Sequence, residues 1–370
     1  MAEWVECTIG DLCDAISDTY KGSDDKVILV NTSDVLEGKV LNHTQVPNKY
    51  LKGQFKKTFR KNDILFSEIR PANKRFAFID FEDTLNYIAS TKLMVLRHNE
   101  KVLPEYLFAI LKSNCVLAEL QHLAETRSGT FPQITFTSEL APMKVKVPDK
   151  KTQTQIVSVL SSIEEKMDVN EKINNNLEQQ ALEIFDNMFP NISNGKKTIG
   201  NTITPKRGKG LLSKNAVFGN VPVVAGGLEP STYHNTANTV APVIAISASG
   251  ANAGYVSLWN IPIWSSDSSY IDSSMTDDVY FWYTLLKKRQ KEIYDAQTGS
   301  AQPHIYPQHI ASMPMHDLNF DEVHNYTSIV TSIFEMIGHN KNENVRLASA
   351  RDILLPKLMS GKLDVSNIKF

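Results

Sequence analysis

Residues 156–188 read IVSVLSSIEEKMDVNEKINNNLEQQALEIFDNM, and they predict a long helix with one continuous seam. Steps of four and three residues alternate along the stretch between positions that carry mainly apolar or amide side chains. These positions are Ile156, Leu160, Ile163, Met167, Asn170, Asn174, Leu177, Ala181, Ile184 and Met188. This spacing is the heptad seam of a coiled coil. We expect the helix to begin after Pro148 and to end near Pro190, which gives a rod of about 60 Å at about 1.5 Å per residue.

The same seam recurs 170 residues later in the chain. Its positions are Tyr326, Val330, Ile333, Ile337, Asn340, Asn344, Leu347, Arg351, Leu354 and Leu358. If the two helices pair antiparallel, their midpoints bring Asn170 and Asn174 opposite Asn340 and Asn344. Buried asparagine in a seam fixes the register of a coiled coil at some cost in stability. The alternative is that each helix packs on a globular domain of its own and leaves its asparagines in water.

The duplication extends beyond the helices, as internal repeats of homologous domains do. The repeated positions before each helix are Gly129, Thr130, Gln133 and Ile134 in the first copy and Gly299, Ser300, Gln302 and Ile305 in the second, where one more residue precedes the isoleucine. Near the front of each copy, residues 8–11 (TIGD) are echoed by residues 198–201 (TIGN), at an offset of 190. The second module is therefore about twenty residues shorter between its fixed ends. Two copies that share their end segments but differ in the length of the segment between them predict two homologous domains with different binding surfaces.

The expected fold class is α/β (α+β), with two homologous globular domains joined by two long antiparallel coiled-coil helices in a pseudo-twofold repeat. Short strands are expected at residues 63–66 and 76–79, around a basic loop, and at residues 221–224 and 243–246, because β-branched and apolar residues alternate with turn residues there. The expected division is a first globular domain at 1–149, a first helix at 150–190, a second globular domain at 191–318, and a second helix with a tail at 319–370.

Charge is distributed unevenly along the 370 residues, although the net charge is only -2. Residues 21–75 carry twelve Lys and Arg against six Asp and Glu, and residues 198–217 carry four basic residues and no acid. Residues 153–189 carry two lysines against seven acids. Basic segments on both sides of an acidic one suggest phosphate-facing surfaces joined by a segment that does not face phosphate. Chance clustering of charges on a solvated surface is the alternative.

Several classes of protein are excluded by what the chain lacks. The first residues have neither a basic nor an apolar signal region, and no apolar stretch reaches the length of a membrane span. Cys7, Cys13 and Cys115 form no CxxC pair, which argues against a zinc site or a disulfide framework. We therefore expect a cytoplasmic protein without a metal or a cofactor.

No catalytic motif is present. The chain lacks the Asn/Asp-Pro-Pro-aromatic loop of a DNA methyltransferase, the glycine-rich loop of a P-loop translocase and an HExxH sequence. Asp149 and Glu164 to Lys166 match the loose pattern of metal-dependent nucleases, but Glu164 falls inside the predicted helix, about 20 Å from Asp149 along its axis. His304, His309 and His316 have no carboxylate or cysteine at metal-ligand spacing, so we interpret them as loop or surface residues.

Three segments resemble a known family, and the resemblance covers essentially the whole chain. The ending Leu354–Leu363 (LLPKLMSGKL) is similar to the C-terminal helix end of type I restriction-modification specificity subunits, and Thr298–Ile305 and Val221–Val223 resemble segments of their second module. The resemblance implies that each module is a target recognition domain for one half of a split DNA sequence. It also implies that the helices act as a spacer and dock methyltransferase subunits, and through them the restriction and translocase subunits.

A DNA reader needs cations for phosphates and hydrogen-bonding groups for base edges. In the first module the candidates are Lys56, Lys57, Arg60, Lys61, Arg70, Lys74, Arg75, Arg127, Thr130 and Gln133. In the second module they are Lys206, Arg207, Lys209, Ser249, Asn252, Gln302 and His304. Any single member could equally be a solvated surface residue, so the prediction concerns the clusters.

The expected partners are double-stranded DNA, methyltransferase subunits and restriction subunits, with a helix pair that sets the gap of a bipartite, asymmetric target. The acidic residues of the first helix, which we expect on its outer face, form either a docking surface or a solvated face; they are Glu164, Glu165, Glu171, Glu178 and Glu183. Two further hypotheses remain: a subunit of a related enzyme that fuses methylation and cleavage in one partner, and a scaffold protein that binds no DNA.

Overall fold

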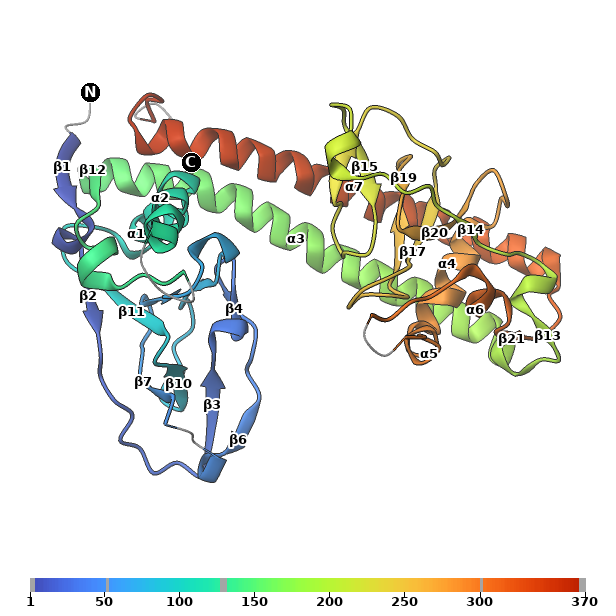
Figure 1. Cartoon of the computed structure of the whole chain (residues 1–370), viewed down its shortest axis with the longest axis horizontal. Coiled ribbons are helices and arrows are strands. Elements are labelled where there is room, and N and C mark those ends of the chain that lie inside the picture. Colours follow the sequence, from blue (N-terminus) through green and yellow to red (C-terminus); the bar gives the residue numbers. More distant parts are fainter. Residues whose placement is uncertain (1–3, 51–52, 127–131, 300–301, 366–370) are drawn as a thin grey trace. The chain divides into compact units, whose positions relative to one another are not determined.

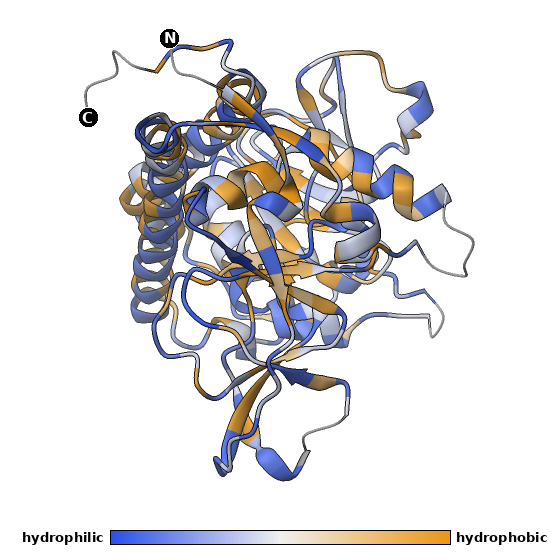
Figure 2. Ribbon diagram, turned by 90° about the vertical axis from the view of Figure 1, so that its left-hand side faces the viewer, coloured by the Kyte–Doolittle hydropathy of each residue, from blue (hydrophilic) through white to orange (hydrophobic). Residues whose placement is uncertain are grey.

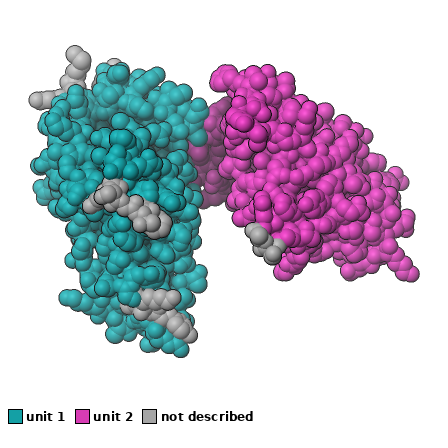
Figure 3. All heavy atoms as spheres, viewed as in Figure 1, with its two compact units in different colours: residues 1–165, 347–370 teal, residues 166–346 magenta. Residues whose placement is uncertain are grey.

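The computed structural model describes residues 4–50, 53–126, 132–299 and 302–365, shown in Figure 1. The chain divides into two compact units, which are coloured separately in Figure 3. Unit 1 consists of residues 1–165 and 347–370, and unit 2 consists of residues 166–346. The boundary falls inside both long helices, α3 (Lys150–Met188) and α7 (Phe320–Met359), so neither helix is a unit of its own. The first helix begins and ends where its flanking prolines predict.

Unit 1 contains two four-stranded sheets that pack face to face. The first has the order β2 (Cys13–Ile16), β11 (Leu93–His98), β8 (Ile64–Ser67), β9 (Phe76–Phe78), and all its neighbours are antiparallel. The second has the order β6 (Gln45–Pro47), β3 (Lys26–Val30), β10 (Tyr87–Ser90), β7 (Phe55–Lys57), with β3 and β10 parallel. A hairpin of β4 (Val35–Leu36) and β5 (Lys39–Val40) lies beside β9.

Strand β8, at the centre of the first sheet of unit 1, is buried on both faces, which explains its apolar run from Ile64 to Phe66. Side chains alternate across a strand, so Ile64 and Phe66 enter the core on the helix side, whereas Leu65 enters the core shared with the second sheet. The helix side is covered by α1 (Pro104–Leu111) and α2 (Asn114–Thr126). Hydrophobic residues are concentrated in such strands and helices, whereas the two long helices are largely hydrophilic (Figure 2).

Unit 2 repeats this architecture. Its first sheet has the order β14 (Lys206–Arg207), β20 (Ser268–Asp272), β17 (Val243–Ser247), β18 (Val256–Trp259), again antiparallel throughout. Its second sheet has the order β16 (Thr232–His234), β15 (Val221–Val224), β19 (Trp264–Ser265). The helices are α4 (Val279–Lys288), α5 (Gln290–Asp295) and α6 (Pro307–Ala311). Among the described residues no strand of unit 2 takes the place of β7, in keeping with the shorter second module.

A two-stranded sheet joins the first and last strands of each module, and its pairing confirms the duplication residue by residue. In unit 1, β1 (Trp4–Thr8) pairs with β12 (Lys144–Pro148); in unit 2, β13 (Lys197–Thr198) pairs with β21 (Pro314–Met315). Ile9 donates its amide to the Met143 carbonyl at 2.9 Å, and Ile199 donates to the Met313 carbonyl at 3.0 Å. A Cβ on the glycine after each isoleucine would lie 3.1 Å from the Ala141 side chain in unit 1 and 2.9 Å from the Ala311 side chain in unit 2, so the same close approach recurs in both repeats.

The asparagine layer predicted for an antiparallel helix pair is present in unit 2. The Asn170 amide donates to the Asn344 carbonyl oxygen at 2.8 Å, and the Asn340 amide donates to that of Asn174 at 2.9 Å. Partner numbers fall on α7 as they rise on α3, so these segments run antiparallel. Asn170, Asn174 and Asn340 are only 1%, 8% and 6% exposed. The alternative of solvated asparagines is therefore wrong, although both helices also pack on the modules.

Replacing Asn340 by alanine should destabilise unit 2 by about 1–3 kcal/mol, because the buried Asn174 oxygen loses its donor. Asn176→Ala, at an exposed position of α3, provides the matched control and should change the free energy of unfolding by less than about 0.5 kcal/mol. Urea unfolding followed by circular dichroism measures both. Equal unfolding midpoints for the two variants would show that the amide pair contributes nothing.

Candidate nucleic-acid interface

Three loops of unit 1 meet where the central strands of its first sheet end, after β8 and before β11, and we call this end of the sheet its edge. In the loop after β8, the Glu68 carbonyl accepts a hydrogen bond from Ile134 N at 2.8 Å. Arg70 N of the same loop donates to the Pro132 carbonyl at 3.1 Å. Glu68 N in turn donates to Lys92 O, just before β11, at 3.0 Å. These backbone bonds join the basic loop at 68–75 to the segment that follows the repeated glycine. The edge is therefore built from segments that are distant in sequence.

The polar side chains at this edge are connected through Glu68. Gln133 donates its amide to the Glu68 carboxylate at 3.1 Å, and Lys92 approaches the same carboxylate at 3.6 Å. Lys57 donates to the Leu93 carbonyl at 2.8 Å, and burial lowers the pKa of Lys57. Arg70 is exposed, has a left-handed backbone (φ 47°), and bonds its side chain to no group in the described part of the chain.

The other predicted cations of unit 1 divide into two groups. Lys74 pairs with Glu37 at 2.9 Å, and Arg75 donates to the carbonyls of residues 33 and 35, so both hold the β4–β5 hairpin against the basic loop. Lys56 is exposed on β7. Arg60 and Lys61 precede β8 and therefore lie at its opposite end, away from the edge described above. Arg127 and Thr130 lie outside the described residues.

Unit 2 has the same three-loop edge. Ile305 N donates to Ala248 O at 2.9 Å, Gly250 N donates to Pro303 O at 3.0 Å, and Ala248 N donates to Asp267 O at 3.1 Å. These bonds repeat those of unit 1 one for one. They make Ile305 the counterpart of Ile134, and they make Asp267 the counterpart of Lys92.

The backbone pairing corrects the alignment that the sequence suggested for the second loop. We expected Gln302 to correspond to Gln133. Gln133 forms its β-bridge with Ile69, and the equivalent bridge of unit 2 joins His304 to Ser249. His304 therefore takes the place of Gln133, because the extra residue is absorbed before the proline rather than after it. Gln302 is exposed.

The side chains at the edge of unit 2 differ from those of unit 1. Asp267 accepts from Arg207 at 2.6 Å and from the hydroxyl of Ser249. The His304 ring stacks on the half-exposed Tyr306, with ring centroids 6.0 Å apart and planes at 14°. Lys206 and Lys209 are exposed beside Arg207, and Asn252 lies half-buried in the turn after β17. The two units thus share the backbone hydrogen bonds of this edge, but the hydrogen-bond donors and acceptors of their side chains differ.

Comparison with known proteins finds similarity over the first half of the chain. Residues 1–179 match the family described as the type I restriction modification DNA specificity domain. The chain is 43% identical over 192 residues to the type I restriction enzyme HindI specificity subunit of Haemophilus influenzae, a match that spans 51% of this chain and 41% of that relative. The first half of the chain is therefore similar to type I restriction-modification specificity subunits.

Two further proteins extend the similarity along the chain. The type I restriction enzyme MjaIX specificity subunit of Methanocaldococcus jannaschii is 24% identical over 308 residues, which cover 72% of this chain and 71% of that relative. The solved S subunit of a type I system from M. genitalium superposes with a TM-score of 0.56 at 19% identity, over 97% of this chain and 96% of that one. This likeness shows that the fold of that subunit extends over both units.

Sequence reasoning missed four members of the two edges of this chain: Glu68, Lys92, Asp267 and Tyr306. Charge patterning directs attention to cations and therefore passes over Glu68 and Asp267, although carboxylates position cations and accept hydrogen bonds from bases. Their signal in the sequence is their position, because Glu68 directly follows β8 and Asp267 directly precedes β20. A polar residue directly beyond a buried strand lies at the edge of the sheet.

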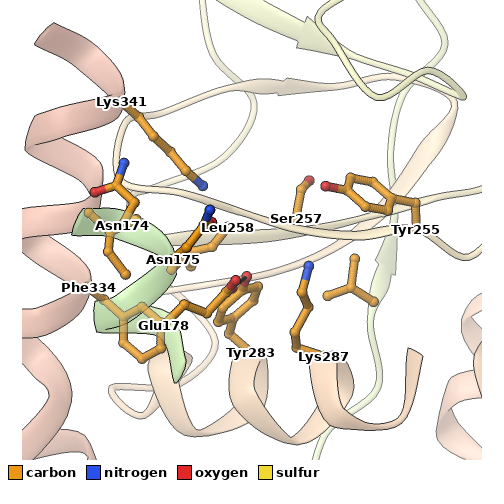
Figure 4. A pocket seen from close by; sticks show the side chains of 12 residues that line it. Asn174, Asn175, Glu178, Tyr255, Ser257, Leu258, Tyr283, Lys287, Phe334 and Lys341 are labelled. Carbon is orange, nitrogen blue, oxygen red and sulfur yellow. Dashed lines mark hydrogen bonds between the residues drawn. The ribbon is translucent and has the colours of Figure 1, made fainter. Parts of the chain in front are cut away.

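A cavity of about 150 Å³ in unit 2 lies between module and helices, lined by α3, α4, β18 and α7. Figure 4 shows Glu178 beside Tyr283, whose hydroxyl donates to the Glu178 carboxylate. Burial, with that carboxylate, raises the pKa of Tyr283, so the hydroxyl keeps its proton. Lys287 lies 5.4 Å from the Tyr255 ring centre, and Lys341 also lines the cavity. This cavity belongs to the attachment of the module to its helices.

The acidic face expected on the first helix is smaller than its sequence suggests. Glu164 bonds to Lys112 of the first module, and Glu178 bonds to Tyr283 of the second, so both are half-buried within their own units. Glu165, Glu171 and Glu183 remain exposed. The structure therefore divides these five acids into two that hold modules to helices and three on the surface.

The loose nuclease pattern has a structural explanation instead. The Asp149 carboxylate caps the start of α3 by accepting from Thr152 N at 3.1 Å, and Glu164 is bonded to Lys112. Within the described ranges no three His, Cys, Asp or Glu side chains gather as a metal-binding group would require. No described helix is both long enough and apolar enough to cross a bilayer.

Proposed function

We propose that this chain is the DNA-recognition subunit of a type I restriction-modification complex. Unit 1 reads one half of a split target, unit 2 reads the other, and the two long helices set the gap between the half-sites. The chain performs no chemistry itself; it docks methyltransferase subunits, and through them restriction subunits, in the cytoplasm. The observation that carries this proposal is the three-loop edge, which occurs twice on equivalent backbone with different side chains.

The edge chemistry supports DNA as the ligand. Exposed cations near each edge, among them Arg70 in unit 1 and Lys206 and Lys209 in unit 2, suit contacts to phosphates, which fix position. The neutral groups of Gln133 and His304 suit contacts to base edges, which carry sequence. Because the two edges differ at equivalent positions, their half-sites must differ, and the target is asymmetric.

Deleting the gene should abolish one bipartite methylation motif in the source genome. Long-read sequencing that detects modified bases, with and without the gene, measures this directly and gives both half-sites and the gap. The gene restored on a plasmid should bring the motif back. A wild-type genome in which no split motif depends on this gene, although its methyltransferase partner is expressed, would contradict the proposal.

A further inference from the structure

We propose that Arg207 reads a guanine in the half-site of unit 2 and that Asp267 is its positioning residue. This inference rests on the proposed function and deepens it, because it names the base and the side chain that recognises it. Guanine presents two acceptors, O6 and N7, in the major groove, and the forked guanidinium of arginine matches them with two parallel hydrogen bonds. The contact requires an arginine whose side chain is exposed to solvent, is held in one orientation, and has N–H donors that are not already hydrogen-bonded within the protein.

Arg207 is held in one direction by a carboxylate that is itself fixed. Its Nη2 donates to Asp267 Oδ1 at 2.6 Å, while Asp267 Oδ2 accepts the Ser249 hydroxyl. A residue of strand β14 and a residue of the loop after β17 therefore hold the two oxygens of one carboxylate. A charge-assisted hydrogen bond of this kind orients the guanidinium before DNA arrives, which reduces the side-chain entropy lost on binding.

The remaining donors of Arg207 are free to bind. The side chains of Arg207 and Asp267 are 42% and 40% exposed, so the pair lies at the surface of the edge rather than inside the unit. Arginine has five N–H donors, and in the described part of the chain the Arg207 side chain bonds only to Asp267. One side of its fork thus remains open toward solvent.

Arg207 also lies among the other polar groups of the edge. It pairs with Ser269 across β14 and β20, and the bridge between Ser249 and His304 brings the second loop to the same place. An arginine that only neutralised a phosphate would need no such buttress, because a flexible cation serves that purpose equally well.

Unit 1 has no counterpart of this pair, which makes the inference specific to one half-site. Strand register places Ser17, directly after β2, where Arg207 lies in unit 2. Lys92 takes the place of Asp267 and approaches Glu68 at 3.6 Å. The charge at this position is reversed between the repeats, so the first half-site must be read differently.

The test measures methylation by the assembled complex of this chain with its methyltransferase partner. In Arg207→Lys the charge is kept and the fork is lost, so discrimination at one G·C pair of the second half-site should fall about 10-fold or more. Asp267→Asn should reduce discrimination at the same base pair, but to a smaller extent. Lys291→Ala is the control in the same unit, because Lys291 lies on α5 with its side chain 87% exposed and pairs with Asp295, and the motif of this variant should be unchanged.

Binding of the same complexes to duplexes with each base at each position of the second half-site completes the test. If Arg207→Lys changes base discrimination at one G·C pair alone, the result supports recognition of guanine by Arg207. Equal weakening on every sequence, or unchanged discrimination in Arg207→Lys, overturns it, as does a wild-type second half-site without a G·C pair. A wild-type complex with no split target contradicts the proposed function itself, which distinguishes the two failures.

Discussion

One heptad inserted into each long helix should lengthen the gap between the half-sites by about three base pairs. Seven residues extend a helix by about 10 Å, and duplex DNA rises about 3.4 Å per base pair. The insertions belong after Glu165 in α3 and after Arg346 in α7, where the boundary between the units crosses the helices. Seven residues preserve the heptad register, so the seam and its asparagine layer stay paired. Methylation mapping of the variant measures the new gap.

Both half-sites should stay the same in that variant, because neither edge is altered. A heptad inserted into α3 alone is the control; it leaves seven residues without a partner, so we expect loss of methylation rather than a new gap. A double-insertion variant that still methylates the wild-type target efficiently would show that the helices do not set the gap.

Replacing Arg97 by methionine should destabilise unit 1 by about 3–5 kcal/mol. Arg97 donates to both oxygens of Asp63, at 2.8 and 2.7 Å, and the Asp63 side chain is only 1% exposed. The hydrogen bonds with Asp63 also raise the pKa of Arg97. Without the guanidinium, the buried Asp63 carboxylate, directly before β8, loses both of these hydrogen bonds and keeps the one from Arg60 N at 2.9 Å. Thermal unfolding of the purified chain should show an earlier transition for unit 1.

A surface pair supplies the control for that measurement. Lys291 and Asp295 lie 2.7 Å apart with both side chains exposed, so Lys291→Met should leave the transition where it is. Combining Arg97→Met with Asp63→Leu should recover part of the loss, because no unpaired charge then remains. An Arg97→Met transition at the wild-type temperature would contradict the burial argument.

The helices, the repeat and the asparagine layer were predictable from the sequence because each depends on spacing along the chain. A heptad seam keeps one face of a helix toward its partner whatever the surrounding domains do. Homologous modules likewise keep their end segments, as residues 8–11 and 198–201 show. The basic loop at 70–75 was also predictable, since it lies between two short apolar strands.

The composition of the two edges was decided by the tertiary structure. Sheet pairing brings together residues distant in sequence, so no local pattern predicts that Asp267 meets both Arg207 and Ser249. The same pairing places Lys61 at the far end of β8 and assigns Arg75 to a hairpin.

The sequence by itself therefore determined that two related modules are joined by a pair of long helices, because periodicity and duplication are properties of the chain. Which side chains share a surface was decided only by strand register. A shift of one residue in register sends a side chain to the opposite face of a sheet. For that reason the counterpart of Gln133 is His304 and not Gln302.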